Sequence, residues 1–321
     1  MLKRSAPCPV CGDSGTSPAL VGRDRLLRST TRVFELSACP ACECLFIDPQ
    51  PLAGELAAFY PDTYWRKTEP SRLGAAEALY RRIALADHLR FLRQTARHVQ
   101  GAGPHPRLLD VGCGTGLLLD QARRAGFSVT GIDASAQAAA TAETEYGIPV
   151  RTGTLDQTKF ETGAFDIVTM FHTLEHVTAP RAAIAEAHRV LQPRGRLILQ
   201  VPNIGSWQRR LLGANWHGLD IPRHTINYSR RSLVRLLSAC GFHVRRIRHF
   251  NLRDNAPALA SSLAPHLDPI SRAARNQPEG PLAGWARHLV YLGLVAMACP
   301  FALVEATAGC GATLMVEAAK S

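Results

Sequence analysis

Leu108-Leu109-Asp110-Val111-Gly112-Cys113-Gly114-Thr115-Gly116 is the stretch that decides the fold of this 321-residue chain. A short apolar run ends in Asp110, and three glycines at alternating positions follow before the helix-like run 117–125. The pattern predicts a buried parallel strand, a tight turn and a helix. Glycine suits such a turn because it adopts positive φ and lets the backbone approach a ligand closely.

The next predicted strand, residues 128–133, ends in Asp133. A carboxylate at this place can accept hydrogen bonds from both hydroxyls of a ribose. A dinucleotide-binding fold is disfavoured, because its G-x-G-x-x-G fingerprint needs glycine where this chain has Leu117. The glycine turn with Asp133 resembles instead motif I and the following acidic residue of the class I S-adenosylmethionine (SAM) methyltransferases.

The rest of the chain supplies the elements of an α/β fold. Strands are expected at 149–151, 165–171, 196–203 and 242–250, and helices at 75–99, 135–146, 182–191 and 232–240. A last strand at 311–319, antiparallel to its neighbours, would complete the doubly wound, seven-stranded, mostly parallel sheet that the resemblance implies. In the turn 192–195, Arg194 replaces a glycine of the family, so a positive φ is expected to fall on Gly195.

Three regions are expected along the chain. A zinc-ribbon-like domain would cover 1–60, a helical linker or lid 61–104, and the methyltransferase domain 105–321. The boundary near 104 follows from the cluster of glycine and proline at 101–106. The last domain would carry a helical apolar insertion at about 251–309.

The apolar part of that insertion, 289–304, contains no charged residue. As a helix it would span only about 24 Å, less than a hydrocarbon core of about 30 Å, and Pro300 would kink it. We therefore expect a helical pair that packs on the domain, dimerises, or dips into a membrane surface beside Arg272, Arg275 and Arg287.

Two C-x-x-C pairs near the N-terminus predict a structural zinc site with the ligands Cys8, Cys11, Cys39 and Cys42. A segment this short buries too small a hydrophobic core to fold well without a bound metal ion that cross-links it. Four sulfur ligands leave no open position for catalysis, so the zinc would serve folding. Cys44 is either a spare thiol or a substitute for Cys42.

The resemblance implies a set of cofactor-binding residues. Motif I would approach the methionine and ribose parts of SAM, and Asp133 would hold the ribose. Asp156, beyond the third strand, is a candidate for the adenine amino group, with a loop aspartate as the alternative. Phe171 would border the adenine or the sulfonium. The full set is Asp110, Gly112, Cys113, Gly114, Thr115, Gly116, Asp133, Asp156 and Phe171.

The fourth strand delivers Leu174-Glu175-His176-Val177 to the sheet edge where ligands bind in open α/β sheets. This run resembles the L-E-H-V segment of ubiquinone-type O-methyltransferases, and its place makes His176 a candidate catalytic residue. A metal site built from His172, Glu175 and His176 is one alternative. Hydrogen bonds that open a helix and hold the loop are another.

A dense group of aromatic, acidic and imidazole side chains occupies 216–224. The pattern W-H-x-x-D-x-P-R-H recurs in these methyltransferases and implies a role on the substrate side. His224 is the candidate general base, and Asp220 could fix its tautomer. Arg223 is a candidate for binding an anionic substrate group, while a structural histidine in a packed loop is the alternative for His224.

The composition is that of a globular protein, and the net charge of +11 permits anionic partners without choosing among them. Residues 1–7 show no secretory signal, so we expect a cytoplasmic, or membrane-associated, protein. The expected function is SAM-dependent methylation of a small-molecule or lipid- or sugar-linked acceptor at oxygen. An RNA methyltransferase and a non-catalytic SAM-binding partner in an envelope assembly complex are the alternatives. Nucleic acid is the less favoured partner, because the basic residues form no single tract, and a homo-oligomer is left open.

Overall fold

The computed structural model describes residues 6–60, 85–275 and 280–321. The chain divides into two compact units. The first unit consists of Met1–Thr68, Pro202–Leu233 and His249–Leu314, and the second of Glu69–Val201, Val234–Arg248 and Met315–Ser321. Much of the predicted linker at 61–104 lies outside the described residues.

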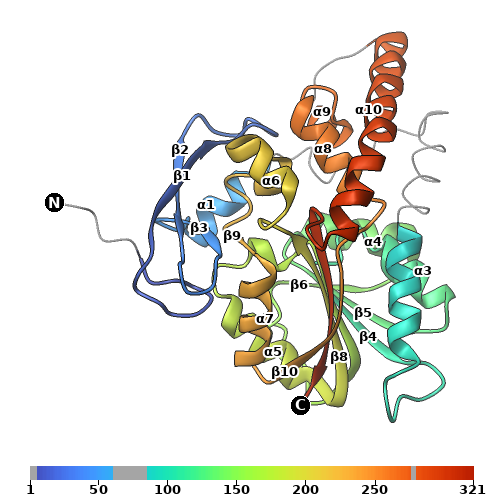
Figure 1. Ribbon diagram of the computed structural model, residues 1–321. Helices are drawn as coiled ribbons and strands as arrows, with labels where there is room; N and C mark the ends of the chain where they lie inside the picture. The colour runs from blue at the N-terminus through green and yellow to red at the C-terminus, as the bar shows by residue number, and fades with distance from the viewer. Residues whose placement is uncertain (1–5, 61–84, 276–279) are drawn as a thin grey trace. The chain divides into compact units, whose positions relative to one another are not determined.

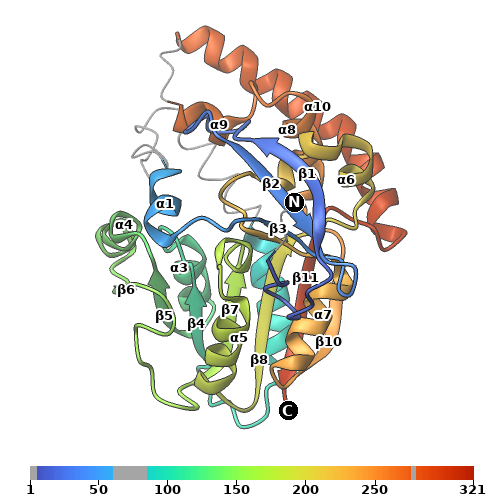
Figure 2. The same ribbon diagram turned by 90° about the vertical axis from the view of Figure 1, so that its left-hand side faces the viewer.

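The second unit contains most of a seven-stranded sheet in the order β10-β11-β8-β7-β4-β5-β6 (Figures 1 and 2). Its strands are β4 (Arg107–Val111), β5 (Ser128–Asp133), β6 (Val150–Thr152), β7 (Phe165–Phe171), β8 (Leu191–Pro202), β10 (Phe242–Arg248) and β11 (Thr313–Lys320). The pairs β4–β5, β5–β6, β4–β7 and β7–β8 are parallel, and β10–β11 is antiparallel. The predicted doubly wound, mostly parallel sheet is confirmed.

Helices cover both faces of this sheet, with α3 and α5 on opposite sides (Figure 1). The helices are α3 (Leu117–Arg124), α4 (Ala136–Tyr146), α5 (Pro180–Val190), α7 (Arg230–Ala239) and a helical segment at 85–96. The sequence sets the ends of α4, because the Ser135 hydroxyl accepts a hydrogen bond from Ala138 N and Gly147 follows at φ 62°. Phe91, Leu108 and Ile198 belong to the core between helix and sheet.

The turn before the fifth parallel strand differs from its prediction. β8 already begins at Leu191, and the positive φ of 63° falls on Arg194, so the expectation for Gly195 is wrong. Gly195 is needed for space instead. A Cβ there would lie 3.0 Å from the Gln192 carbonyl oxygen and 3.1 Å from that of Asp166.

The first unit is built around an antiparallel sheet in the order β1-β2-β3-β9. Its strands are β1 (Ser17–Arg23), β2 (Val33–Ala38), β3 (Leu45–Ile47) and β9 (Ile226–Asn227). Phe34 and Ile47 of these strands share a buried cluster with Trp216 and Ile221. The unit also holds α1 (Ala53–Ala58), α6 (Trp207–Leu212), α8 (Asn255–Leu263), α9 (Pro269–Ala274) and the 3-10 helices η2 (Gly213–Asn215) and η3 (His217–Leu219).

The apolar part of the insertion, 289–304, lies within one helix, α10 (Pro281–Thr307), and does not form the predicted helical pair. Pro300 lies inside this helix, and Ala298 and Ala302 on either side of it pack into a cluster with Ala256 of α8. At about 1.5 Å per residue the 27 residues of α10 are about 40 Å long, because the helix extends beyond the stretch 289–304 at both ends. Among the described residues, α10 is the one helix whose length and composition would permit it to cross a membrane.

Candidate functional site

The glycine turn after β4 adopts the backbone conformation that the sequence predicts. Gly112, Gly114 and Gly116 have φ values of 74°, 53° and 81°. A Cβ on Gly112 would lie 2.3 Å from Thr173 Oγ1. The turn is tied to β5, because Gly112 N donates to the Ile132 carbonyl at 2.8 Å. Glycine is therefore required here by conformation and by the packing of Thr173.

Asp133, at the end of β5, is the acidic residue of this turn. Its Oδ2 accepts a hydrogen bond from Gly114 N and its Oδ1 one from Ser135 N, both at 2.8 Å. Burial raises the pKa of the Asp133 carboxyl, and these two hydrogen bonds and the charge of His176 oppose the rise. Because an ionised carboxylate offers about four acceptor positions, two remain for a ligand.

Asp110 lies under the turn and is only 3% exposed. Its Oδ1 accepts a hydrogen bond from Thr169 Oγ1 at 2.6 Å. Burial raises the pKa of the Asp110 carboxyl to about 7, the charge of Asp133 adds to the rise, and the bond from Thr169 opposes it. The carboxyl therefore titrates near neutral pH.

Replacing Asp110 with asparagine should flatten the pH dependence of stability. The pKa of about 7 lies above the ordinary aspartate value of 3.8, so the proton that Asp110 keeps stabilises the folded state fully below about pH 4. As the pH rises from about 4 to 7 this contribution is lost, up to about 4 kcal/mol in the free energy of unfolding. Urea titrations followed by circular dichroism should show the fall in the wild type and little of it in Asp110→Asn. Asp156→Asn is the control and should show the same fall as the wild type. An equal fall in the wild type and in Asp110→Asn would contradict the raised pKa of Asp110.

The other predicted cofactor residues of the second unit differ in their exposure. Cys113 turns its side chain into a cluster with Leu119 and Ile148, so only its backbone faces the turn. Thr115 is half-buried on the turn, and Asp156 is exposed. The Asp156 carboxylate accepts a hydrogen bond from Thr154 Oγ1. The ring of Phe171 lies edge-on to His88, with 4.7 Å between ring centroids.

The loop after β7 forms the 3-10 helix η1 (Leu174–His176). His172 Nδ1 lies 3.3 Å from Glu175 Oε1, and its Nε2 lies 3.1 Å from Gln200 Nε2. Protein groups therefore engage both ring nitrogens of His172, which disfavours this residue as a metal ligand. Glu175 is fully buried, and His176 is half-buried at the end of η1.

His224 lies in the first unit, in the loop after η3. Its Nδ1 is 2.9 Å from the Gly218 carbonyl oxygen and its Nε2 is 3.9 Å from Asp220 Oδ2. A carbonyl can only accept, so Nδ1 carries a proton, and in the neutral ring Nε2 carries the lone pair. The contact with Gly218 thus sets the tautomer, a role that the sequence analysis gave to Asp220.

Arg223 is completely buried in the first unit, which does not fit its predicted role in binding a substrate anion. Its guanidinium donates to Asp24 at 2.9 and 3.1 Å, to Asp220 at 3.1 Å and to the Phe59 carbonyl. Burial alone would raise the pKa of both carboxyls, but the charge and hydrogen bonds of Arg223 hold them below their ordinary values. Arg223 is a structural residue that joins three segments of the unit.

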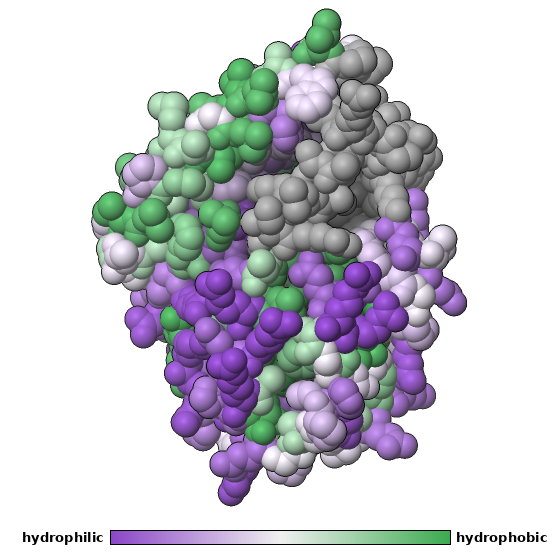
Figure 3. All heavy atoms as spheres, turned by 90° about the vertical axis from the view of Figure 1, so that its right-hand side faces the viewer, coloured by the Kyte–Doolittle hydropathy of each residue, from purple (hydrophilic) through white to green (hydrophobic). Residues whose placement is uncertain are grey.

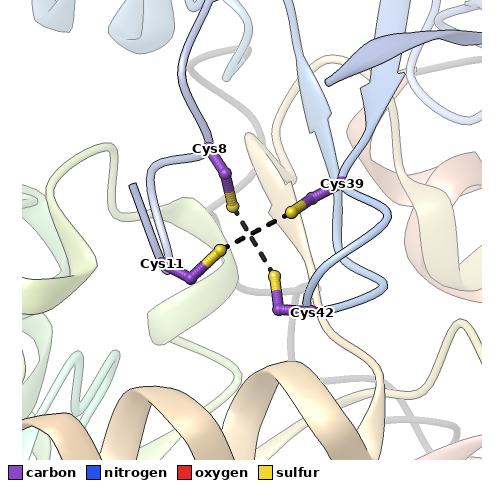
Figure 4. A group of neighbouring side chains, drawn as sticks. All are labelled: Cys8, Cys11, Cys39 and Cys42. Atoms are coloured by element: carbon purple, nitrogen blue, oxygen red, sulfur yellow. Dashed lines mark hydrogen bonds between the residues drawn. The ribbon is translucent and has the colours of Figure 1, made fainter. Parts of the chain in front are cut away.

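The predicted zinc ligands come together in the first unit (Figure 4). Cys8 and Cys11 flank one turn, and Cys39 and Cys42 belong to the turn between β2 and β3. All four sulfurs lie within 4.8 Å of one another, with Cys8–Cys42 at 3.6 Å and Cys11–Cys39 at 3.5 Å. Four thiolates about 2.3 Å from one metal ion would be about 3.8 Å apart, so the donors fit a tetrahedral zinc site.

Cys44 adds a fifth sulfur beside this cluster, 3.4 Å from Cys8 Sγ and 3.5 Å from Cys42 Sγ. It is fully buried. Its position is compatible with both predicted roles, a spare thiol and a substitute for Cys42 as a zinc ligand.

Sequence reasoning missed several partners of the site residues. Thr169 bonds to Asp110, Thr173 packs on Gly112, and Asp24 pairs with Arg223. Thr169 carried a usable signal, because it is the one hydroxyl in the apolar run of β7 and pairs with Asp110 across the parallel ladder. Asp24 carried none, since it lies 199 residues from its partner.

Comparison with known proteins agrees with this geometry. The methyltransferase domain family matches residues 77–247, more than half of the chain. The ubiquinone biosynthesis O-methyltransferases of Xanthomonas oryzae pv. oryzae and Pseudomonas aeruginosa are both 35% identical over 130 residues, which is 38% of this chain and 54% and 56% of theirs. The chain thus spans about half the length of these curated relatives.

Solved structures show the same fold. A crystal structure from Galdieria sulphuraria, whose name proposes a sarcosine dimethylglycine methyltransferase, has a TM-score of 0.51 at 18% identity. The match covers 83% of this chain and 96% of that one. The predicted resemblance is confirmed, and the chain belongs to the methyltransferase domain family of the class I SAM-dependent enzymes.

Proposed function

We propose that this protein transfers the methyl group of SAM to an oxygen atom of a small-molecule or lipid- or sugar-linked acceptor. The observation that carries the proposal is the bond between Asp133 and Gly114 N, which joins the positive-φ glycine turn after β4 to the end of β5. Ligands of open α/β sheets bind at this edge of the parallel strands.

The second unit offers SAM two kinds of contact. The backbone of the glycine turn would lie against the methionine and ribose parts, and the remaining lone pairs of Asp133 would accept hydrogen bonds from the ribose hydroxyls. SAM would supply an electrophilic methyl group on its sulfonium. The chain's task is then to hold the acceptor in line with that methyl, since orientation supplies much of the rate.

Transfer to oxygen is supported by the ubiquinone biosynthesis O-methyltransferases among the relatives. Removing the proton of an acceptor hydroxyl needs a base, and His224 is our candidate. In the neutral ring its Nε2 carries the lone pair, and the Asp220 carboxylate 3.9 Å away would stabilise the imidazolium that forms.

Calorimetric titration with SAM, its demethylated product and NAD tests the cofactor. We expect both SAM and its product to bind and NAD not to bind. Asp133→Asn should weaken SAM binding about 10- to 100-fold, because charge-assisted hydrogen bonds to the ribose are lost. Glu143→Gln, on an exposed face of the same unit, is the matched control. Unchanged affinity in a folded Asp133→Asn, or binding of NAD alone, would refute the proposal.

Turnover is tested with methyl-labelled SAM and cell extracts that contain both water-soluble and lipid-linked acceptors. Label should enter an acceptor through an ether bond, and His224→Gln should lose this transfer while keeping its affinity for SAM. SAM binding without transfer to any fraction would instead describe a non-catalytic SAM-binding protein. Transfer to RNA, with binding that weakens steeply as salt rises, would describe an RNA methyltransferase.

A further inference from the structure

Helix α10 has one buried face and one exposed apolar face. Its buried residues, Tyr291, Ala298, Ala302 and Glu305, follow one line along the helix. The opposite side is apolar and exposed from end to end, with Leu282, Leu289, Met297, Leu303 and Val304 each at least 49% exposed. Figure 3 shows this side as a green band that runs from the top of the view toward the left. Only 22% of the most apolar 18-residue stretch of α10 is buried.

Hydrogen bonds hold the buried face of α10 within the first unit. The Glu305 carboxylate accepts from Gln208 N at 2.9 Å and from Gln208 Nε2 at 3.0 Å, both in α6. Near the middle of the helix, Tyr291 Oη lies 3.0 Å from Ser261 Oγ of α8, and Ser261 in turn donates to Asp268 at 2.7 Å. These bonds fix α10 at two points more than three turns apart.

The same bonds argue against a membrane-spanning α10. A spanning helix would lose the partners of Glu305 and Tyr291, and a charged side chain in a bilayer costs several kcal/mol. Helix α8, earlier in the chain, packs on α10, and the chain after α10 returns to the same unit through Leu314. A helix joined at both ends to one compact unit can lie in the surface of a bilayer, with the protein covering its other side.

The width of the apolar face favours lipid over a second copy of the chain. At 3.6 residues per turn, the exposed apolar residues from Leu292 round to Val290 cover an arc of about 160°. A single partner helix would cover a narrower seam, whereas acyl chains and headgroups can cover the whole arc. No charged side chain of α10 lies on this arc, since Arg287 and Glu305 lie toward the other face.

The N-terminal part of α10 carries the residue types that prefer a membrane–water interface. Trp285 is 42% exposed at the edge of the apolar face, and the exposed Arg287 follows half a turn later. The chain has a net charge of +11, which complements an anionic leaflet. We infer that α10 is an in-plane membrane-binding helix that seats the first unit on an anionic lipid surface through its exposed apolar face.

Vesicle sedimentation with the full chain tests this inference. The probe is a vesicle of phosphatidylglycerol and phosphatidylcholine. The wild type should sediment with it, and the triple variant Leu289→Gln, Met297→Gln, Val304→Gln should bind at least tenfold more weakly. A matched triple variant, Val21→Gln, Val33→Gln, Leu52→Gln, changes three exposed apolar side chains elsewhere in the same unit and should bind like the wild type.

Three outcomes would overturn the inference. The first is a wild type that stays in the supernatant, and the second is a triple α10 variant that binds as well as its matched control. The third is a wild-type dimer that the α10 variant converts to a monomer without any vesicle binding, which would assign the face to a second copy. Because the inference does not rest on methyl transfer, loss of vesicle binding and loss of SAM binding are separate results.

Depth measurements test the orientation. A fluorescent unnatural amino acid placed in turn at Leu282, Ala296 and Leu303 should be quenched equally by lipids brominated near the headgroup, because the three positions lie at one depth. If Ala296 alone were quenched by lipids brominated near the end of the acyl chain, the helix would span the bilayer. That result would overturn the in-plane orientation.

Discussion

Removing zinc from the four-cysteine site is expected to unfold the N-terminal strands β1, β2 and β3. The two turns that carry Cys8, Cys11, Cys39 and Cys42 are brought together by sulfurs with the spacing of a tetrahedral site. Structural zinc contributes on the order of 10 kcal/mol in small zinc domains, which is comparable with the whole stability of a typical domain. Phe34 and Ile47 of these strands share a buried cluster with Trp216, so the loss should reach the core of the first unit.

The measurement combines metal content with tryptophan fluorescence. The three tryptophans that the structure describes, Trp207, Trp216 and Trp285, all belong to the first unit, so their emission reports on that unit. We expect one zinc ion per chain, and a red shift of the emission when a chelator removes it. Cys39→Ser should show the same red shift without a chelator, and Cys240→Ser, a half-buried thiol of the second unit, should not.

Cys44→Ser separates the two roles of the fifth sulfur. If Cys44 is a spare thiol, the variant keeps its zinc, and if it replaces Cys42 as a ligand, the variant loses zinc while Cys42→Ser keeps it. A wild type that is purified from zinc-replete cells without metal, or a Cys39→Ser variant as stable as Cys240→Ser, would contradict the zinc site altogether.

The sheet and the conformation of the glycine turn could be predicted because they depend on local patterns. A run such as Phe165–Phe171 is buried on both sides in a parallel sheet and therefore appears as uninterrupted apolar sequence. The glycine turn is similarly local, since its positive φ values restrict residue type directly. The two C-x-x-C pairs carry their geometry in their spacing, and the structure brings all four sulfurs together.

Sequence reasoning missed a helix boundary and a contact between distant segments. Counting apolar residues placed the start of the insertion helix at 289, because Arg287 and His288 interrupt the run, yet α10 begins at Pro281. Neither residue stops a helix, so polarity was a poor guide to its boundary. The role of Arg223 was wrong for a related reason, because burial and a partner 199 residues away cannot be read from the loop itself.

That burial makes Arg223→Met the substitution with the next largest expected effect, a loss of about 3 to 5 kcal/mol in the free energy of unfolding. The variant leaves the Asp24 and Asp220 carboxylates without the guanidinium that now bonds both. Methionine fills similar space without a charge, so the loss reports the uncompensated carboxylates. Urea unfolding followed by tryptophan emission measures it in the first unit. Arg231→Met, which breaks the exposed pair with Glu43, should cost less than about 1 kcal/mol.

The pH dependence distinguishes this electrostatic cause from simple misfit of the methionine. In the wild type, Arg223 lowers the pKa of both carboxyls, so their contribution to stability is present above the ordinary pKa near 4 and is lost as the pH falls below it. In Arg223→Met the buried carboxyls should instead have raised pKa values, and protonation at mildly acidic pH should relieve part of the loss. The difference between the two proteins is therefore expected to shrink from pH 7 toward pH 4. The triple variant Asp24→Asn, Asp220→Asn, Arg223→Met should be more stable at pH 7 than Arg223→Met alone, and a constant difference across this range would assign the loss to packing.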